Sequence, residues 1–216
     1  MTENRPSLAV IGGTGKLGNG LALRWARAGH PVLIGSRAAE RAAETAAEIG
    51  NGAQGLSNAE AAAAGEIVVV TVPFATQAEI LGDIRGGVDG KIVVDTTVPL
   101  VPPKVARVQL PAAGSAAQAA QALLGEDARV VSAFHNVAAH KLPLDGPIDC
   151  DVLVFGDAPA DRDVIIGLAE AAGLRGVHGG PLANSAAAEA LTSVLIGINK
   201  RYKADGAGIR ITGIGG

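Results

Sequence analysis

The sequence predicts an α/β fold, doubly wound around a mainly parallel sheet, with a small C-terminal helical or α/β extension. Short runs rich in Val and Ile alternate with Ala-rich stretches of helical length, as in chains built from β-α-β units. The short runs are apolar at nearly every position, which is typical of strands buried on both faces. Strands are expected at Leu8–Ile11, Pro31–Gly35, Ile67–Val72, Ile92–Asp95, Val130–Phe134, Val152–Phe155 and Arg175–His178.

The stretches between these strands have the apolar spacing of helices. In the first stretch, residues 15–28, Leu17, Leu21 and Trp25 fall on one face, and Gly29 supplies a stop signal. Ser115 is a candidate N-cap for a later helix. The other helices are expected over Ala38–Ile49, Asn58–Ala64, the segment after Pro73, Gly114–Leu124, Asp161–Ala172 and from about Pro181 to Tyr202.

Composition limits the class of protein. The chain has 216 residues, enough for one large α/β domain. Hydrophobic residues make up 48% and aromatic residues 2%, so Ala, Val, Leu and Ile must build the core. A net charge of −3 without runs of like charge argues against nucleic acid as the main partner. The single cysteine, Cys150, excludes an intrachain disulfide. Neither a signal peptide nor a bilayer-length apolar run is recognisable, so we expect a cytoplasmic protein without a membrane partner.

The first strand is followed by a glycine-rich loop, residues 12–18, with the sequence GGTGKLG. Gly13, Gly15 and Gly18 fit the G-x-G-x-x-G pattern, which binds a dinucleotide when it joins a strand to a helix. Gly13 is expected to make the tight turn, Gly15 to let a pyrophosphate approach the backbone, and Gly18 to let helix and strand pack closely. Free N–H groups at the helix start would face the phosphates. The loop therefore predicts a Rossmann-type nucleotide site.

The end of the second strand indicates which dinucleotide is bound. An NAD site has an acidic residue about 20 residues beyond the glycines, on the ribose hydroxyls. This chain has Gly35-Ser36-Arg37 there, with Arg41 one helical turn later. An acid would repel a 2′-phosphate, whereas Ser36 offers a hydroxyl and the two arginines offer charge-assisted donors. The pattern predicts NADP(H) over NAD, and the alternative is a pair of solvated surface arginines.

Ligands of an open α/β sheet bind beyond the carboxyl ends of its strands, and three such ends carry informative residues. Phe74 follows Pro73 after one strand, and a proline-rich loop begins at Pro99 after the next. After a third strand, His135 and Asn136 leave the sheet together. His135 is the candidate catalytic residue, able to donate a hydrogen bond to a substrate carbonyl or to ferry a proton. The alternative is a histidine that caps a loop.

Other chemistries lack the residues that they need. The four histidines and one cysteine show no metal-ligand spacing, so no metal is expected, and no G-x-S-x-G elbow is present. Hydride transfer needs two rings held face to face with water excluded, and few reactive side chains. The sequence therefore predicts an oxidoreductase that acts on a small-molecule redox acceptor.

Seven segments, in order and spread over nearly the whole chain, give a more specific expectation. They read IGGTGKLGNGLALRWARAGH, IGSRAAER, VVVTVPF, VVDTTVPL, GSAAQAAQALL, VVSAFHNVAAHKL and GGPLANSAAAEAL. In these segments the chain resembles the NADPH:coenzyme F420 oxidoreductases. The resemblance implies reversible hydride exchange between NADPH and the deazaflavin ring of coenzyme F420, carried out by a homodimer.

The resemblance also implies a set of binding residues. The 2′-phosphate of NADPH would be bound by Ser36, Arg37 and Arg41. The pyrophosphate would be contacted by Thr14, Gly15, Lys16 and Leu17. The two rings would lie near Val72, Pro73, Val98, Pro99, His135, Asn136 and Val137.

Residues 1–140 are expected to form the NADP-binding domain, and residues 141–216 a smaller substrate-side region continuous with it. Two other readings of the nucleotide site stay open. One is an NADPH-dependent reductase of another acceptor, such as a pterin, flavin, imine or ferric complex. The other is an NADP-sensing module without catalysis. Consumption of NADPH with a panel of acceptors separates these readings.

Overall fold

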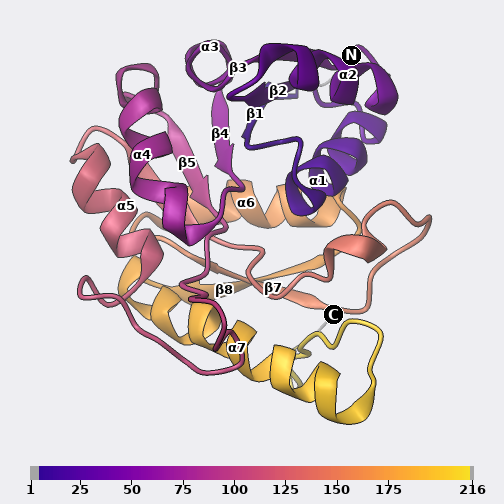
Figure 1. Ribbon diagram of the computed structural model, residues 1–216, viewed down its shortest axis with the longest axis vertical. Helices are drawn as coiled ribbons and strands as arrows, with labels where there is room; N and C mark the ends of the chain where they lie inside the picture. The colour runs from indigo at the N-terminus through magenta and orange to yellow at the C-terminus, as the bar shows by residue number, and fades with distance from the viewer. Residues whose placement is uncertain (1–4, 215–216) are drawn as a thin grey trace.

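Strands and helices alternate along residues 5–214, the part of the chain that the computed structural model describes (Figure 1). The strands are β1 (Leu8–Ile11), β2 (Val32–Ser36), β3 (Gln54–Ser57), β4 (Ile67–Val70), β5 (Ile92–Asp95), β6 (Arg129–Ser132), β7 (Asp151–Phe155) and β8 (Arg175–Gly180). The α-helices are α1 (Lys16–Arg27), α2 (Ala39–Ile49), α3 (Asn58–Ala64), α4 (Phe74–Ile84), α5 (Ala116–Leu124), α6 (Pro159–Ala171) and α7 (Ser185–Tyr202). Short 3-10 turns cover Arg85–Gly87, Ala139–Lys141 and Leu182–Asn184.

The strands form an eight-stranded sheet in the order β3-β2-β1-β4-β5-β6-β7-β8. All neighbours from β3 to β6 are parallel. β7 joins β6 in the antiparallel direction through the pair Ser132–Phe155, and β8 runs parallel to β7. Val70, Asp95 and Ser132 end neighbouring strands side by side. The segments that follow them therefore meet at one edge, which we refer to as the carboxyl edge of the sheet.

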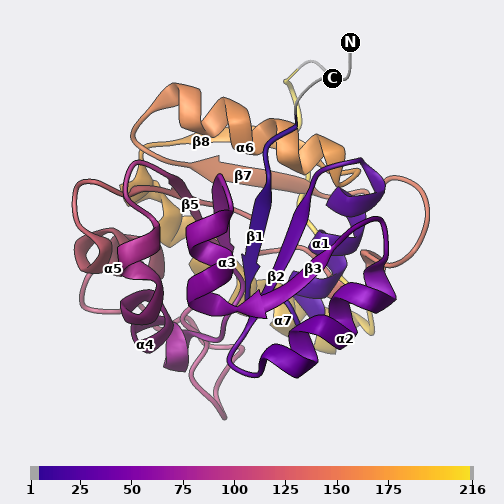
Figure 2. The same cartoon turned by 90° about the horizontal axis from the view of Figure 1, so that it is seen from above.

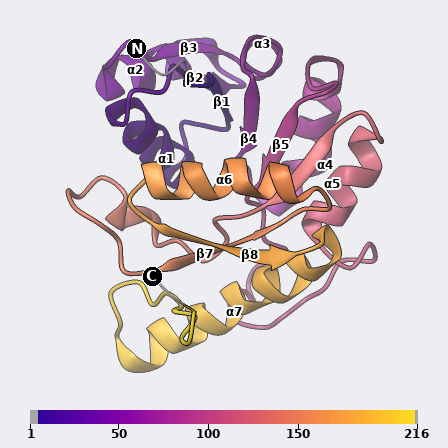
Figure 3. The same cartoon turned by 180° about the vertical axis from the view of Figure 1, so that it is seen from behind.

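Helices cover both faces of the sheet. α1, α2 and α6 pack on one face, where Leu21, Trp25 and Ile165 belong to the core. α3, α4 and α5 pack on the other face, around Leu81 and Ala120. Figure 2 shows β1, β2 and β3 side by side, with α6 running along β7. β7 and β8 lie between α6 and α7 (Figures 1 and 3). α7 therefore covers the side of these two strands that faces away from α6.

The C-terminal half of α1 joins the first and last thirds of the chain. The indole N–H of Trp25 donates to the carbonyl of Leu168 in α6 at 2.8 Å. The guanidinium of Arg24 is buried and donates to the carbonyls of Leu142 at 2.7 Å and Ala172 at 3.0 Å. These carbonyls lie in the loop before β7 and at the end of α6, where the helix dipole favours a cation. α1 is therefore held at the same time by the sheet and by the C-terminal region.

The predicted fold class and the order of the predicted elements are confirmed, with local differences. β3 was not expected, because its sequence QGLS lacks an apolar run and the strand lies at the sheet edge. β4 ends at Val70 instead of Val72, ahead of Pro73, which has no N–H to continue the ladder. Ser115 does cap α5, since its side chain accepts from the N–H of Gln118. The expected C-terminal extension consists of β7, α6, β8 and α7 and continues the same sheet.

None of the helices described between residues 5 and 214 has the length and apolar character that a membrane span requires.

Candidate active site

The glycine-rich loop takes the shape that the sequence predicts, with one change in the role of a glycine. Gly12 has a φ of +72°, so the tight turn is made by Gly12 and not by Gly13. The N–H of Gly15 donates to the Gly12 carbonyl at 3.0 Å and closes the turn. Gly13 is needed for another reason, because a Cβ there would lie 2.8 Å from the carbonyl oxygen of Val10.

Gly18 has the predicted packing role at the start of α1, and Gly15 begins that helix. A Cβ at Gly18 would overlap the hydroxyl of Thr71 and lie 2.9 Å from the Cα of Gly13, so only glycine lets α1 approach the sheet this closely. Gly15 is exposed and is the N-cap of α1, with no side chain to occupy the first N–H groups of the helix. These N–H groups and the positive end of the helix dipole are therefore available to an anion.

A groove of about 310 Å³ begins at this loop and runs along the carboxyl edge. Seven of the predicted binding residues line it, namely Thr14, Gly15, Ser36, Arg37, Arg41, Val72 and Pro73. Arg37 and Arg41 are exposed, and no ion pair found within residues 5–214 involves either of them. Ser36 is buried and its Oγ accepts from the N–H of Ala38 at 3.2 Å, which leaves its hydroxyl proton for another acceptor.

The groove also has lining residues that the sequence did not indicate. Asn58, at the start of α3, is buried, and its side-chain oxygen accepts from the N–H of Gly12 at 3.4 Å. Asn58 therefore holds the glycine-rich loop in place from the start of α3. Thr71 donates to the carbonyl of Ile11 at 2.9 Å and packs under Gly18. A polar residue directly after β4 was the only available indication for Thr71, and none pointed to Asn58, which follows the unexpected strand β3. The remaining new lining residues are Gly12, Ala38, Thr76 and Ile80.

The predicted ring contacts lie at the ends of β4, β5 and β6. The hydroxyl of Thr97 donates to the carbonyl of Val72 at 3.4 Å, which ties the two segments together. Val98 and Pro99 follow Thr97 directly; Val98 is half-buried and Pro99 is buried. The structure therefore brings Val72, Pro73, Val98 and Pro99 to neighbouring strand ends, next to the nucleotide groove.

His135 is buried at the end of β6, with 6% of its surface exposed. Its Nε2 is 2.7 Å from the Oγ of Ser132, and its Nδ1 has no partner among the described residues. Burial lowers the pKa of His135 to about 3, since the charged form would lose its hydration. The imidazole is therefore neutral at physiological pH and serves as a hydrogen-bonding group, not as a cation.

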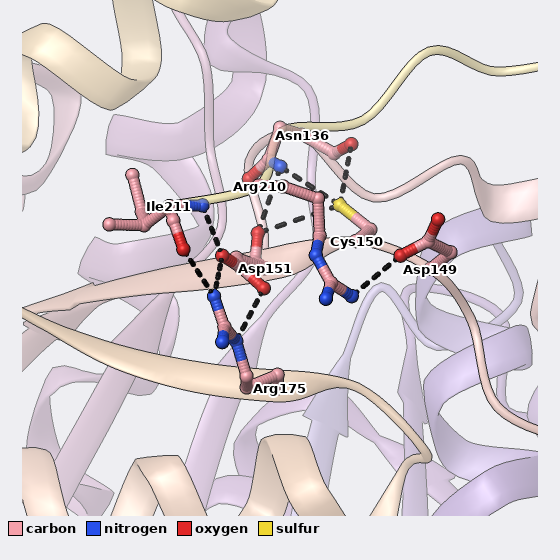
Figure 4. A network of polar contacts seen from close by, with 7 residues as sticks. All are labelled: Asn136, Asp149, Cys150, Asp151, Arg175, Arg210 and Ile211. Atoms are coloured by element: carbon pink, nitrogen blue, oxygen red, sulfur yellow. Dashed lines mark hydrogen bonds and ion pairs between the residues drawn. The ribbon is translucent and has the colours of Figure 1, made fainter. Parts of the chain in front are cut away.

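The neighbouring residue Asn136 points elsewhere. Its amide nitrogen donates to the Sγ of Cys150 and to the carbonyl of Asp151, both at 3.1 Å (Figure 4). The carboxylate of Asp151 in turn binds Arg175 and the N–H of Ile211. The amide of Asn136 thus fastens the His135 loop to β7, and it does not line the nucleotide groove. Val137 is half-buried and packs against the core on the α1 side of the sheet.

Comparison with known proteins identifies the family. The family model described as "NADP oxidoreductase coenzyme F420-dependent" matches residues 7–99. F420-dependent NADP reductases from Methanothermobacter marburgensis and Methanocaldococcus jannaschii are each 39% identical, over 96% of this chain and 98% of theirs. The chain belongs to the F420-dependent NADP reductase family. This confirms the predicted family and the prediction of an NADP-dependent oxidoreductase.

A solved structure confirms the fold of this reductase independently. A crystal structure from Arthrobacter sp. FB24, described as a candidate F420-dependent NADP reductase, superposes with a TM-score of 0.80 and 24% identity. The match covers 97% of this chain and 99% of that one. The Rossmann-type arrangement and the C-terminal extension therefore occur together in both chains.

Two buried carboxyl groups lie close to the reductase's carboxyl edge. Asp95 ends β5, accepts from the N–H of Thr97 at 3.0 Å and from the amide of Gln77 at 2.5 Å, and is 1% exposed. Glu189 of α7 is also 1% exposed and accepts from the N–H groups of Ala116 and Ala117. Burial raises the pKa of Asp95 to about 6. Burial, with a further contribution from the Asp95 charge, raises the pKa of Glu189 to about 7.

The close approach at Gly18 leads to a first prediction. In Gly18→Ala, the new methyl group displaces α1 from Gly13 and Thr71, and we expect NADPH affinity to fall about tenfold or more, equivalent to about 1.4 kcal/mol. Isothermal titration calorimetry measures this. Gly82→Ala on α4 is the matched control, because nothing lies within 4 Å of its Cβ position. The control should keep its affinity and gain about 0.5–1 kcal/mol of stability. Equal affinities in the two variants would contradict the prediction.

The raised pKa of Glu189 predicts a pH dependence of stability. The native state holds this proton more tightly than the unfolded chain, so native stability falls as pH rises from the ordinary pKa of 4.5 to about 7. Relative to wild type, Glu189→Gln should gain stability with rising pH across this interval and keep a constant difference above it. Urea unfolding at a series of pH values measures the difference.

The same comparison has a matched control in Glu79→Gln, which changes an exposed carboxylate on α4. Its difference from wild type should stay flat over the interval. A flat difference for Glu189→Gln as well would show that the native fold does not raise the pKa of Glu189.

Proposed function

We propose that this chain transfers hydride between NADP(H) and coenzyme F420. The observation that carries the proposal is one groove that joins the glycine-rich loop and two arginines, which form no ion pair among residues 5–214, to the end of β4, with the end of β5 held beside it through Thr97. F420-dependent NADP reductases that match this chain over 98% of their own length at 39% identity support the identity of the second substrate. In the reaction, NADPH gives a hydride to the deazaflavin ring, a proton is taken from water, and NADP⁺ and reduced F420 result.

In this proposal the chain's residues bind and orient the two substrates. The pyrophosphate lies on the N–H groups of Lys16 and Leu17 at the start of α1, next to Gly15, which has no side chain to block its approach. Thr14 contacts the same group from the loop. Rings held between the ends of β4, β5 and β6 are brought into contact in a site walled by apolar residues, which excludes water.

The 2′-phosphate of NADPH is proposed to bind at the end of β2. Arg37 and Arg41 supply positive charge there, and the Ser36 hydroxyl supplies a hydrogen bond. Each guanidinium binds a phosphate oxygen pair more strongly than a neutral donor does. This arrangement selects NADPH over NADH because NADH lacks the group that these side chains recognise.

His135 is proposed to contact the substrate rings as a neutral residue. The contact with Ser132 fixes the ring plane, and Nδ1 remains for a polar atom of a bound ring. A pKa of about 3 excludes His135 as a source of a proton in its cationic form at neutral pH. The catalytic contribution of His135 is therefore orientation of the acceptor by a hydrogen bond. Val98 and Pro99 are proposed to shape the same wall from the end of β5. Asn136 and Val137 are proposed to support it from behind, through the contacts of Asn136 with β7 and of Val137 with the core.

We also propose a homodimer with the C-terminal region at the substrate side. Val194, Ile198 and Tyr202 lie four residues apart on α7 and are exposed, so they form an apolar stripe suited to a second copy. Residues 1–140 would hold NADP(H), and residues 141–216 would complete the acceptor side. The lone, buried Cys150 is compatible with the reducing cytoplasm, which we propose as the location.

The function is tested by mixing the purified protein, NADPH and F420. We expect the deazaflavin absorbance to fall as NADPH is consumed in equal amount, because one hydride passes from one to the other. Flavin, pterin, imine and ferric acceptors run in parallel should react far more slowly. If NADPH binds and F420 stays oxidised, F420 is not the acceptor. Oxidation by another member of the panel would then identify the acceptor class.

The nucleotide assignment is tested at Arg37. In Arg37→Ala, loss of one charge-assisted contact should weaken NADPH binding about 10- to 100-fold, since such contacts contribute about 1.5–3 kcal/mol. Binding of NADH should change less than twofold. Fluorescence titration with both nucleotides measures the two constants. Arg85→Ala, which removes an arginine outside the groove, is the control. An unchanged preference for NADPH in Arg37→Ala would overturn the assignment.

A further inference from the structure

α7 turns a polar face toward the carboxyl edge. Ser185, Glu189 and Ser193 on this helix are buried, and Thr192 is half-buried. Their spacing of three and four residues places them along one side of the helix. Buried positions of a helix are ordinarily apolar, and a buried carboxylate occurs where specific partners hold it. The partners of this face therefore indicate what α7 does.

Glu189 binds α7 to the first turn of α5. Its two carboxylate oxygens accept from the N–H of Ala116 at 2.7 Å and of Ala117 at 3.1 Å. These donors have no carbonyl partner within α5, and the positive end of the helix dipole favours a carboxylate there. One turn before Glu189, the hydroxyl of Ser185 donates to the Oγ of Ser115 at 2.8 Å. The two contacts hold the start of α7 against the start of α5.

The first turn of α5 is itself fixed to the sheet. The amide of Gln77, on α4, donates to the carbonyl of Ala116 at 3.2 Å and to the Oδ2 of Asp95 at 2.5 Å. Asp95 is the last residue of β5, directly before the segment that contains Val98 and Pro99. Glu189 therefore holds α7 against the first turn of α5, which Gln77 connects by hydrogen bonds to Asp95 at the proposed ring site.

Thr192 reaches the proposed catalytic loop from the same face. Its hydroxyl donates to the backbone carbonyl of His135 at 3.0 Å. Thr192 lies three residues after Glu189, so one helical turn joins the anchor on α5 to the contact with His135. On its other side the loop is held by Asn136, whose amide binds Cys150 and Asp151 (Figure 4).

We propose that Glu189 and Thr192 are positioning residues that hold His135 in place for hydride transfer by linking its backbone to the N-terminus of α5. This inference rests on the proposed function. Among residues 5–214 the ring of His135 is hydrogen-bonded to Ser132 and lies 6.5 Å from the ring of Phe155, centroid to centroid, and its Nδ1 has no partner. The direction of Nδ1 therefore depends on the position of the His135 backbone, which Thr192 sets. Small displacements of such a group reduce catalysis strongly even when binding is intact.

The test uses Thr192→Val, which removes the hydroxyl and keeps the shape of the side chain. We expect kcat/KM for F420 to fall about tenfold, the Kd for NADPH to stay within twofold, and the imidazole nitrogen resonances of His135 to shift. Thr192→Ser restores the hydroxyl and should restore kcat/KM and the resonances. Glu189→Gln should also lower kcat/KM for F420. The Gln amide keeps one acceptor oxygen, and its NH2 group cannot accept from the second N–H of α5.

Ser193→Ala is the matched control on the same helix. Its hydroxyl donates to the carbonyl of Arg107 at 3.5 Å and does not contact His135, so kcat/KM should stay within twofold of wild type. Unchanged kcat/KM and unchanged His135 resonances in Thr192→Val would overturn the proposal, whether or not Glu189→Gln folds. If wild type does not reduce F420 with NADPH, the proposed function fails. The resonances of Thr192→Val and Thr192→Ser then still decide whether Thr192 positions His135.

Discussion

The close approach of α1 to the sheet is the constraint on which the proposed active site depends. Gly18 meets Gly13 and Thr71 with no room for a side chain, so the first turn of α1 points its free N–H groups across the end of β1. Gly12 can then reverse the chain only with a positive φ. The same contact lies beside the groove, because Thr71, which Gly18 touches, lines it together with the next two residues, Val72 and Pro73.

α1 connects the glycine-rich loop to the C-terminal region, because each end of this helix contacts one of them. The N-terminal end carries the N–H groups that we propose to bind phosphate, and the C-terminal end carries Arg24 and Trp25, which bind carbonyls of residues 142–172. The antiparallel pairing of β7 with β6 is short, through Ser132 and Phe155. The placement of β7, and of the Asn136 loop attached to it, therefore relies on contacts of this kind as well as on the sheet.

Local patterns allowed much of this structure to be predicted. Local sequence determines the apolar strands β1 and β5, the loop from Gly13 to Gly18, and the strand end at Ser36 and Arg37. In each of them the residues that set the backbone conformation lie within a few positions of one another. β3 was missed because an edge strand needs no apolar run, and Asn58 was missed with it. Glu189 resembled any surface glutamate of a helix, since its partners lie more than 70 residues away in the sequence. Residues whose role depends on tertiary neighbours could not be found from sequence spacing.

Three buried titratable groups occupy the region where the proposed substrates meet. Asp95, His135 and Glu189 are each at least nine-tenths buried. Burial favours the neutral form of each, so it raises the pKa of the two carboxyl groups and lowers the pKa of the imidazole. Apolar side chains of similar volume would stabilise such positions more, so stability alone does not account for these three. Departures from the rules of core packing are expected where a site must hold polar atoms in fixed directions. Asp95 joins β5 to α4 and Glu189 joins α5 to α7 by directional contacts, and the His135 ring is directed by Ser132 within β6. These buried polar groups at the carboxyl edge cost stability, and in return their hydrogen bonds fix the directions of polar atoms, which apolar side chains cannot do.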